Sequence, residues 1–167
     1  MTLVSELRAA DIPQLKSFVL DAWHLAGSSA LGWTGATDEN IAEIASEGYL
    51  QGLIGNSDLK VFIGKQGECI VGFCAIRKID GQSVELAGII VRQDHLGKGI
   101  GNDLFRKARE EAVGLGFNAM VVKTESTNER ALSFYERRGF VKKGQIVEEL
   151  SGSKVNLTVL HLGLSKK

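Results

Sequence analysis

The sequence predicts a mixed α+β fold: a central sheet of six to seven strands with helices on both faces. Three observations support this class. At 167 residues the chain has the ordinary size of one domain, so we expect a single domain over residues 1–167. The apolar run Leu86 to Val91 leads into a glycine-rich turn and a helical pattern, and a crossover helix implies parallel strands. Turn signals at Gln66-Gly67 and Asp80-Gly81 imply hairpins, and hence antiparallel strands.

The first third of the chain predicts one strand and two helices. Leu3 to Leu7 reads as a strand, and Asp11-Ile12-Pro13 as a helix start with aspartate as the cap and proline in the first turn. Apolar residues then recur at helical spacing: Ile12, Leu15, Phe18, Val19 and Ala22. Residues 27–37 form a loop-like stretch, after which Thr37 or Asp38 is expected to cap a second helix.

The rest of the chain alternates between strand and helix patterns. The predicted strands are residues 59–65, 68–79, 83–92, 118–124, 140–149 and 154–163, and the predicted helices are residues 99–115 and 128–138. Gly116 closes the first of these helices, and Ser151-Gly152 joins the last two strands. The complete order is βααβββαβαββ.

Composition and charge exclude several classes of protein. With 44% hydrophobic and 24% charged residues the chain is globular, and its formal net charge of zero argues against broad attraction to nucleic acid or membrane. A basic group at Arg137, Arg138, Lys142 and Lys143 is interpreted as solvated helix and strand faces. No apolar run has membrane-spanning length, and the first residues lack the pattern of a signal peptide.

Cysteine and histidine usage predicts a cytoplasmic protein without a metal centre. Cys69 and Cys74 lie in one strand-like run at a spacing that does not favour a disulfide, so we interpret both as buried thiols in a reducing cytoplasm. The three histidines are scattered along the chain, and no Cys/His cluster indicates a metal site.

The most informative segment of the sequence is the glycine turn at Gly97, Gly99 and Gly101. Glycine lets the main chain approach a ligand closely because it has no Cβ. The first N–H groups of the following helix lack internal partners, and the helix dipole adds positive potential. Together these features predict a phosphate or pyrophosphate cradle, although a plain turn is the alternative interpretation.

Two common phosphate-binding motifs do not fit this turn. A P-loop requires Lys and then Ser or Thr around its last glycine, whereas Asn102 and Asp103 follow Gly101. The dinucleotide fingerprint Gly-x-Gly-x-x-Gly fails because Asn102 or Leu104 falls at the third glycine position.

The turn instead resembles the coenzyme A loop of the GNAT superfamily of N-acetyltransferases. That motif has Arg or Gln, two residues, Gly, one residue, then Gly or Ala, and Gly99 and Gly101 fit it. Leu96 occupies the Arg/Gln position, which is a departure from the family pattern. Lys98 is expected to add a point charge near the phosphates.

A second motif of the same family is similar to residues 128–140. Asn128 is followed by Ala131, by the pair Tyr135-Glu136 and by Gly139-Phe140. Ser126 and Glu129 have the spacing of a capping box, which predicts the start of the helix. The alternative interpretation is structural: Asn128 caps the helix and Tyr135 belongs to the core. The resemblance covers residues 59–145 well.

The resemblance implies acetyl-CoA as acetyl donor, no metal, and a sheet whose parallel pair is splayed to admit the pantetheine arm. It assigns the pyrophosphate to the backbone of Gly97 to Asn102, and Gly88 is expected to form a bulge that frees a backbone N–H. It makes Tyr135 the general acid for the leaving thiolate. The implied coenzyme-binding residues are Ile89, Ile90, Val91, Leu96, Gly97, Lys98, Gly99, Ile100, Gly101, Asn102, Asn128 and Tyr135.

The catalytic base has three candidates. Glu85 lies on the strand that feeds the glycine turn, at a position similar to the glutamate base of the histone acetyltransferases in this family. Its parity matches Ile89 and Val91, so it shares their face unless a bulge intervenes. The alternative is a strand-surface glutamate paired with a lysine. Glu125 and an ordered water are the other candidate bases.

The acceptor side is expected to involve Trp23 and Trp33, whose rings suit the carbon body or the charge of an amine, although Trp23 fits the core equally well. The main hypothesis is acetyl transfer to a primary amine, of a small molecule or a protein, by direct attack in a ternary complex. The alternatives are a non-catalytic acyl-CoA-binding sensor or partner module and a nucleotide-binding interaction protein. We expect a monomer or homodimer with no nucleic-acid or membrane partner.

Overall fold

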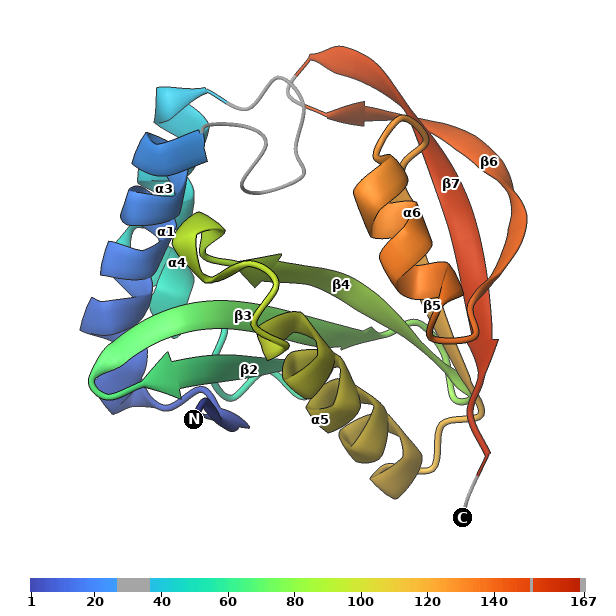
Figure 1. Ribbon diagram of the computed structural model, residues 1–167, viewed down its shortest axis with the longest axis horizontal. Helices are drawn as coiled ribbons and strands as arrows, with labels where there is room; N and C mark the ends of the chain where they lie inside the picture. Colours follow the sequence, from blue (N-terminus) through green and yellow to red (C-terminus); the bar gives the residue numbers. More distant parts are fainter. Residues whose placement is uncertain (27–36, 151, 166–167) are drawn as a thin grey trace.

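The computed structural model describes residues 1–26, 37–150 and 152–165, and in this part of the chain one mixed sheet runs through the molecule (Figure 1). Its seven strands lie in the order β1-β2-β3-β4-β5-β7-β6. Their bounds are β1 Leu3–Glu6, β2 Leu59–Gln66, β3 Cys69–Lys78, β4 Ser83–Val91, β5 Ala119–Glu125, β6 Val141–Leu150 and β7 Ser153–Gly163. The predicted α+β class is confirmed.

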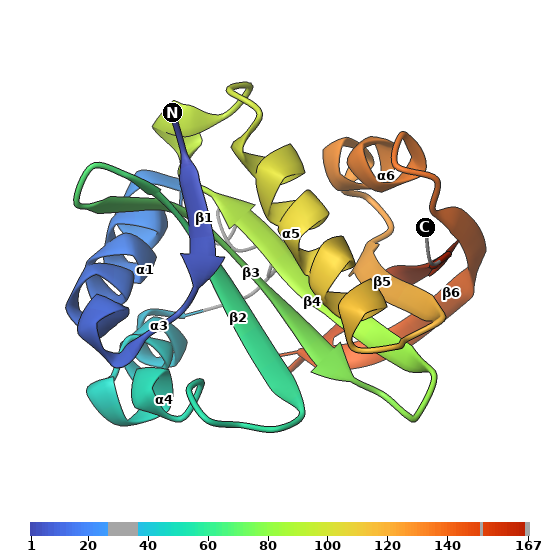
Figure 2. The same cartoon turned by 90° about the horizontal axis from the view of Figure 1, so that it is seen from below.

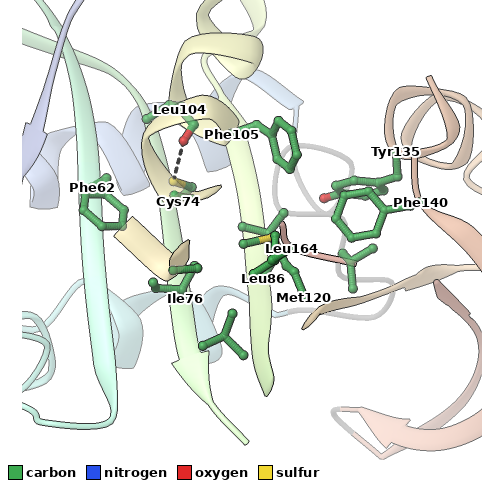
Figure 3. Close-up of a cluster of buried hydrophobic side chains, with 14 of the residues drawn as sticks. Phe62, Cys74, Ile76, Leu86, Leu104, Phe105, Met120, Tyr135, Phe140 and Leu164 are labelled. Atoms are coloured by element: carbon green, nitrogen blue, oxygen red, sulfur yellow. Dashed lines mark hydrogen bonds between the residues drawn. The ribbon is translucent and has the colours of Figure 1, made fainter. Parts of the chain in front are cut away.

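The helices lie on both faces of the sheet, as the sequence predicts (Figure 2). They are α1 Ile12–Ala26, α3 Asp38–Ile44, α4 Glu47–Gln51, α5 Ile100–Gly114 and α6 Glu129–Glu136. One apolar core fills the space under α1, α3 and α4, and a second lies between the other face and α5 and α6. Figure 3 shows the second core, in which Phe62, Leu86, Leu104 and Met120 are almost fully buried. None of the described helices is long and apolar enough to cross a membrane.

The pairing of β4 with β5 is parallel, and it is short. Three residues of β4, Ser83 to Glu85, face Ala119 to Val121, whereas the other neighbours in the sheet are antiparallel. Beyond Glu85 both strands continue without pairing to each other, and Figure 1 shows them moving apart. The splayed parallel pair that the resemblance implies is therefore present in this chain.

Three local expectations differ from the structure. The second predicted helix is two helices, because Ser46 accepts a hydrogen bond from the N–H of Tyr49 and starts α4. Asp11 does not cap α1: its carboxylate accepts from the N–H of Arg8 at 3.0 Å and pairs with Lys65. Cys69 is exposed, not buried, since it begins β3 at the hairpin turn, while Cys74 is buried.

Helix α5 lies close to the sheet because the strands beneath it carry glycine. A Cβ on Gly72 of β3 would lie 2.8 Å from Cδ1 of Leu104 and 3.0 Å from Cγ2 of Ile100. A Cβ on Gly64 of β2 would lie 3.6 Å from the same Ile100 methyl group, an ordinary van der Waals contact, so Gly72 is the position at which α5 needs glycine. The first turns of α5, and with them the glycine loop, are therefore positioned by the missing side chains of the sheet.

We expect Gly72→Ala to lower the free energy of unfolding by about 1–3 kcal/mol, because the added methyl group overpacks the contact with Leu104 and Ile100. Urea unfolding measures the change. Gly81→Ala is the matched control: its Cβ would meet no atom within 4 Å, and we expect less than about 0.5 kcal/mol. Equal losses for the two variants would contradict this account of how α5 is positioned.

Candidate active site

The site is built around the point where β4 leaves β5. Glu85 faces Val121 in the last parallel pair, and a bulge follows directly. Ala75 of β3 faces Gly88 and Ile76 faces Leu86, so β4 has one extra residue, and Gly88 has a φ of 153°. The predicted bulge at Gly88 is confirmed. A bulge bends its strand and leaves backbone groups outside the ladder, as a ligand-binding strand requires.

The bulge changes the face on which Glu85 lies. Leu86, Ile89 and Val91 all belong to the core under α5, which places Glu85 on the opposite face of the sheet. Ile90 packs into the core under α1. The sequence analysis expected Glu85 to share a face with Ile89 and Val91 unless a bulge intervenes; the bulge does intervene, and its extra residue reverses the alternation of side chains between them.

Two cations accompany Glu85. Its Oε2 lies 3.4 Å from Nη1 of Arg77, and its Oε1 lies 3.9 Å from Nζ of Lys123. The Glu85 side chain is 18% exposed, and that of Arg77 is 59% exposed. The hydrogen bond from Lys123 to Glu148, and then the charge of Glu85, raise the pKa of Lys123. The structure thus shows the paired strand glutamate of the alternative interpretation.

Arg77 is a site residue that the sequence motifs did not single out. The turn at Asp80-Gly81 predicts a hairpin, and a hairpin fixes which residues face each other across it. The observed register puts Arg77 opposite Glu85. A two-residue turn at Asp80-Gly81 would put Arg77 opposite Val84; the observed connection is one residue longer, with the N–H of Ile79 bonded to the oxygen of Ser83, so the turn signal places Arg77 only to within one residue of Glu85.

The glycine loop ends at the N-terminus of α5 in a conformation that needs glycine. Gly97 has a φ of 77°, and Gly99, the N-cap, has a φ of 82°. The first helical hydrogen bond joins the N–H of Asp103 to the oxygen of Gly99 at 3.1 Å, so the N–H groups of Ile100 to Asn102 precede the helical ladder. A Cβ on Gly97 or Gly99 would meet no atom within 4 Å. The loop therefore presents open backbone donors to an anion.

The side chains of the loop have different roles. Ile100 is buried against the sheet and anchors the start of α5. Lys98 is exposed, and Leu96 is half-buried at the end of a 3-10 turn, Gln93–His95. Lys98 is thus the basic side chain of the loop that is open to a phosphate group, and the N–H groups supply the remaining positive potential.

Helix α6 packs against the first turn of α5. A Cβ on Gly101 would lie 3.3 Å from the ring of Phe134, so glycine at this position allows the two helices to approach. Phe134 and Tyr135 form an edge-to-face ring pair with centroids 5.3 Å apart, and Tyr135 packs against Phe140 at 5.4 Å. These contacts connect the glycine loop to the second motif.

Asn128 begins α6 as its N-cap. Its Oδ1 accepts a hydrogen bond from the N–H of Ala131 at 3.1 Å. The predicted capping box is wrong, because Ser126 pairs instead with the hydroxyl of Thr158 at 2.9 Å. Asn128 therefore has the structural role that the alternative interpretation assigned to it, and a role toward a ligand would be additional.

Tyr135 is part of the core and is 6% exposed. Burial raises the pKa of its phenol to about 12, so the hydroxyl keeps its proton at neutral pH. In Figure 3 the phenol oxygen points away from α6 and toward the strand that carries Leu86. A buried, protonated hydroxyl directed at the space beside β4 can act as a proton donor there.

Arg138 is not the solvated cation that the sequence suggests. Its guanidinium lies 3.4 Å from the centroid of the Phe134 ring and donates to the Phe134 carbonyl at 2.8 Å. Desolvation lowers its pKa, and its Nε is buried without a hydrogen-bond partner in the described part of the chain. Arg138 thus packs between Phe134 of α6 and Phe105 of α5, with its guanidinium 6.0 Å from the centroid of the Phe105 ring.

The acceptor-side candidates are only partly described. Trp23 packs at the margin of the core under α1, and its indole N–H donates to Oδ1 of Asp38 at 2.7 Å. Trp33 lies outside the described residues. Glu125 ends β5, where β5 no longer pairs with β4. In the described ranges, no group of three or more His, Cys, Asp or Glu side chains is placed to hold a metal ion.

The fold of this chain is similar to that of solved N-acetyltransferases. The PaiA N-acetyltransferase of Thermoplasma acidophilum, solved in complex with coenzyme A, superposes with a TM-score of 0.72 at 20% identity, over 95% of this chain and 98% of that one. The sequence model of the acetyltransferase (GNAT) family matches residues 27–140, and the chain belongs to that family.

Two curated relatives are similar in sequence. The L-amino acid N-acyltransferase MnaT of Escherichia coli is 30% identical over 114 residues, which are 64% of this chain and 66% of that relative. The L-methionine sulfoximine/L-methionine sulfone acetyltransferase of Pseudomonas aeruginosa is 35% identical over 78 residues, 46% of this chain and 45% of that relative. The matches thus span less than two thirds of either relative.

Two substitutions of Asn128 test its role as the N-cap of α6. We expect Asn128→Ala to lower the free energy of unfolding by about 1 kcal/mol, because the N–H of Ala131 loses its acceptor. Asn128→Asp keeps an acceptor and should be nearly as stable as the parent protein, while it removes the amide donors. Urea unfolding measures both. A stable Asn128→Ala protein would contradict the capping role.

Proposed function

We propose that this protein is an acetyl-CoA-dependent N-acetyltransferase that transfers the acetyl group directly to a primary amine in a ternary complex. The observation that carries the proposal is the separation of β4 from β5 beside the open N-terminus of α5. A thioester arm needs a path between strands, and its diphosphate needs donors at the end of that path. Membership of the acetyltransferase (GNAT) family supports the same assignment.

The chain offers a suitable residue set for each part of coenzyme A. The N–H groups from Gly97 to Asn102 and the ammonium of Lys98 would hold the diphosphate. The backbone of Ile89 to Val91, beyond the bulge, would bond the pantetheine arm and the acetyl oxygen. Asn128 would add its amide donors. Leu96 supplies no charge, so affinity for the diphosphate would depend on backbone donors more than on side chains.

Acetyl-CoA, when bound, supplies an activated acyl carbon and a thiolate leaving group. The chain must then orient the amine and move two protons. Tyr135 is the proposed proton donor to the thiolate, because its phenol is protonated and points toward β4. A backbone N–H freed by the bulge at Gly88 would stabilise the negative charge that develops on the acetyl oxygen.

Glu85 is the proposed proton acceptor, with Glu125 or an ordered water as alternatives. It lies where the two strands begin to separate, on the face opposite α5. An amine that approaches from that face would meet the carboxylate directly, while the coenzyme diphosphate binds on the α5 side. The two substrates would then approach the gap from opposite faces of the sheet.

We propose a free amino acid, or a close analogue of one, as the acceptor. Both curated relatives are named for transfer to such molecules. Arg77 and Glu85 present a cation and an anion 3.4 Å apart, which match in sign the carboxylate and ammonium groups of an amino acid. The exposed guanidinium of Arg77 is able to turn toward a carboxylate without leaving its strand.

An assay of thiol release from acetyl-CoA over a panel of amines tests this function. The panel contains L-amino acids, L-methionine sulfoximine and sulfone, an amino acid amide, a polyamine and a peptide N-terminus. We expect release with the amino acid group and little with the amide, which lacks the carboxylate. Coenzyme binding without release for any amine would instead indicate the non-catalytic module.

Tyr135→Phe should lower kcat by about 100-fold, the usual contribution of a positioned proton donor, and leave the dissociation constant of coenzyme A unchanged. Steady-state kinetics and calorimetry measure the two quantities, and thermal unfolding checks that the core is intact. Because burial raises the pKa of Tyr135 to about 12, its ionisation should not limit the rate of the parent protein below pH 10. An unchanged kcat would show that Tyr135 is not the proton donor to the thiolate.

Arg77→Ala tests the acceptor assignment separately from the chemistry. We expect the KM of the best amino acid substrate to rise about 10- to 100-fold, as for the loss of one hydrogen bond between charged groups, with a smaller change in kcat. The control variant is Lys78→Ala, an exposed cation next to Arg77 whose side chain lies on the other face. Similar KM values for the two variants would contradict a free amino acid as the acceptor. They would not contradict acetyl transfer to another amine.

A further inference from the structure

Lys123 lies at the opening between β4 and β5, on the face of the sheet opposite α5. Val121, two residues before it on β5, faces Glu85 in the last parallel pair, so Lys123 follows where the two strands separate. Met120 and Val122 belong to the core under α5. Because side chains alternate along a strand, Lys123 lies on the other face, where Glu85 also lies.

The ammonium of Lys123 lies between two carboxylates. Its Nζ donates to Oε1 of Glu148 on β6 at 2.9 Å and lies 3.9 Å from Oε1 of Glu85. The second oxygen of Glu85, Oε2, lies 3.4 Å from Nη1 of Arg77 on β3. Each oxygen of the Glu85 carboxylate thus has a cation near it, and the contact with Lys123 is the one that crosses the opening.

Lys123 brings a fixed positive charge to this face of the sheet. The hydrogen bond with Glu148, and then the charge of Glu85, raise the pKa of Lys123, so its ammonium stays charged at neutral pH. Arg77 is the third charged group that acts on it. By strand register, the other titratable side chains on this face of β5 and β7 are Glu125 and His161.

We propose that Lys123 is a positioning residue for acetyl transfer, which acts through Glu85 and is itself held by Glu148. The inference rests on the proposed function, in which Glu85 accepts the proton of the amine. Lys123 holds the Glu85 carboxylate at the opening when Arg77 turns toward the carboxylate of an acceptor. Its charge also favours the loss of a proton from an ammonium group bound at Glu85, because two like charges close together are unfavourable.

Glu148 limits how strongly Lys123 acts on Glu85. The hydrogen bond to Glu148 draws the ammonium toward β6, and the negative charge of Glu148 offsets part of the positive charge at the opening. Removal of Lys123 and removal of Glu148 should therefore have opposite effects on proton transfer, although both changes break the same ion pair. A purely structural ion pair would give the same effect in both cases.

The pH dependence of kcat tests this inference. We expect Lys123→Met to move the acid limb of the profile about one pH unit higher, and so to lower kcat on that limb about tenfold, because a proton is held more tightly once the cation is gone. Lys123→Arg keeps the charge and should restore most of the rate. Glu148→Gln should move the same limb lower, since Lys123 is then free to approach Glu85.

Lys60 provides a matched control on the other face of the sheet. Its Nζ donates to Glu111 at 2.8 Å and lies 3.9 Å from Glu6, and its side chain is 32% exposed, against 35% for Lys123. Lys60→Met and Glu111→Gln make the same changes of charge away from the opening and should leave the profile unchanged. Unmoved profiles in Lys123→Met and Glu148→Gln, or shifts in one direction for both, would overturn the inference.

Two further measurements separate this inference from the proposed function. An unchanged kcat in Glu85→Gln would reject Glu85 as the proton acceptor, and the role of Lys123 with it. A large loss of kcat in Glu85→Gln, with unmoved profiles in the Lys123 and Glu148 variants, would reject the role of Lys123 alone.

Carbon-13 NMR of the Glu85 carboxyl group requires no turnover. The pH at which this group takes up its proton should be higher in Lys123→Met, and lower in Glu148→Gln, than in the parent protein. The chemical shifts of core residues in the same spectra check that each variant is folded. Equal values in all three proteins would overturn the inference even if no amine in the panel is acetylated.

Discussion

The architecture of the site depends on the limited pairing of β4 with β5. Hydrogen bonds hold these parallel strands together only from Ser83 to Glu85, and the crossover through α5 lets them separate afterwards. The bulge at Gly88 bends β4 at the same place and takes backbone groups out of the ladder. If β4 and β5 were hydrogen-bonded along their whole length, there would be no path between them for a ligand. The backbone N–H groups of β4 would also be used within the sheet.

Glycine and aromatic contacts keep the two sides of this opening in position. On one side, α5 lies low over the sheet because Gly72 has no side chain, and its N-terminus therefore faces the opening. On the other side, α6 is held to α5 by the ring of Phe134, which fills the space at Gly101 and carries the guanidinium of Arg138. Tyr135 is thus oriented by packing, and its buried phenol retains its proton.

The two faces of the sheet differ in chemistry. On the α5 side, backbone donors and Lys98 suit an anionic coenzyme. On the opposite side, Glu85 lies with Arg77 and Lys123 in a small network of charges. Because the bulge separates these environments within a few residues of β4, one strand can serve a diphosphate-bearing donor and a charged acceptor.

Local patterns in the sequence determined the class of fold, most element positions, the glycine loop and the bulge at Gly88. These features follow from short-range physics: side-chain periodicity, backbone freedom of glycine and the rules of turns. Only the tertiary structure decided the face of Glu85, the pairing of Arg77 and Lys123 with it, and the burial of Arg138 against Phe105. Each of those depends on strand register or on contact between distant segments, because one inserted residue reverses every side chain beyond it.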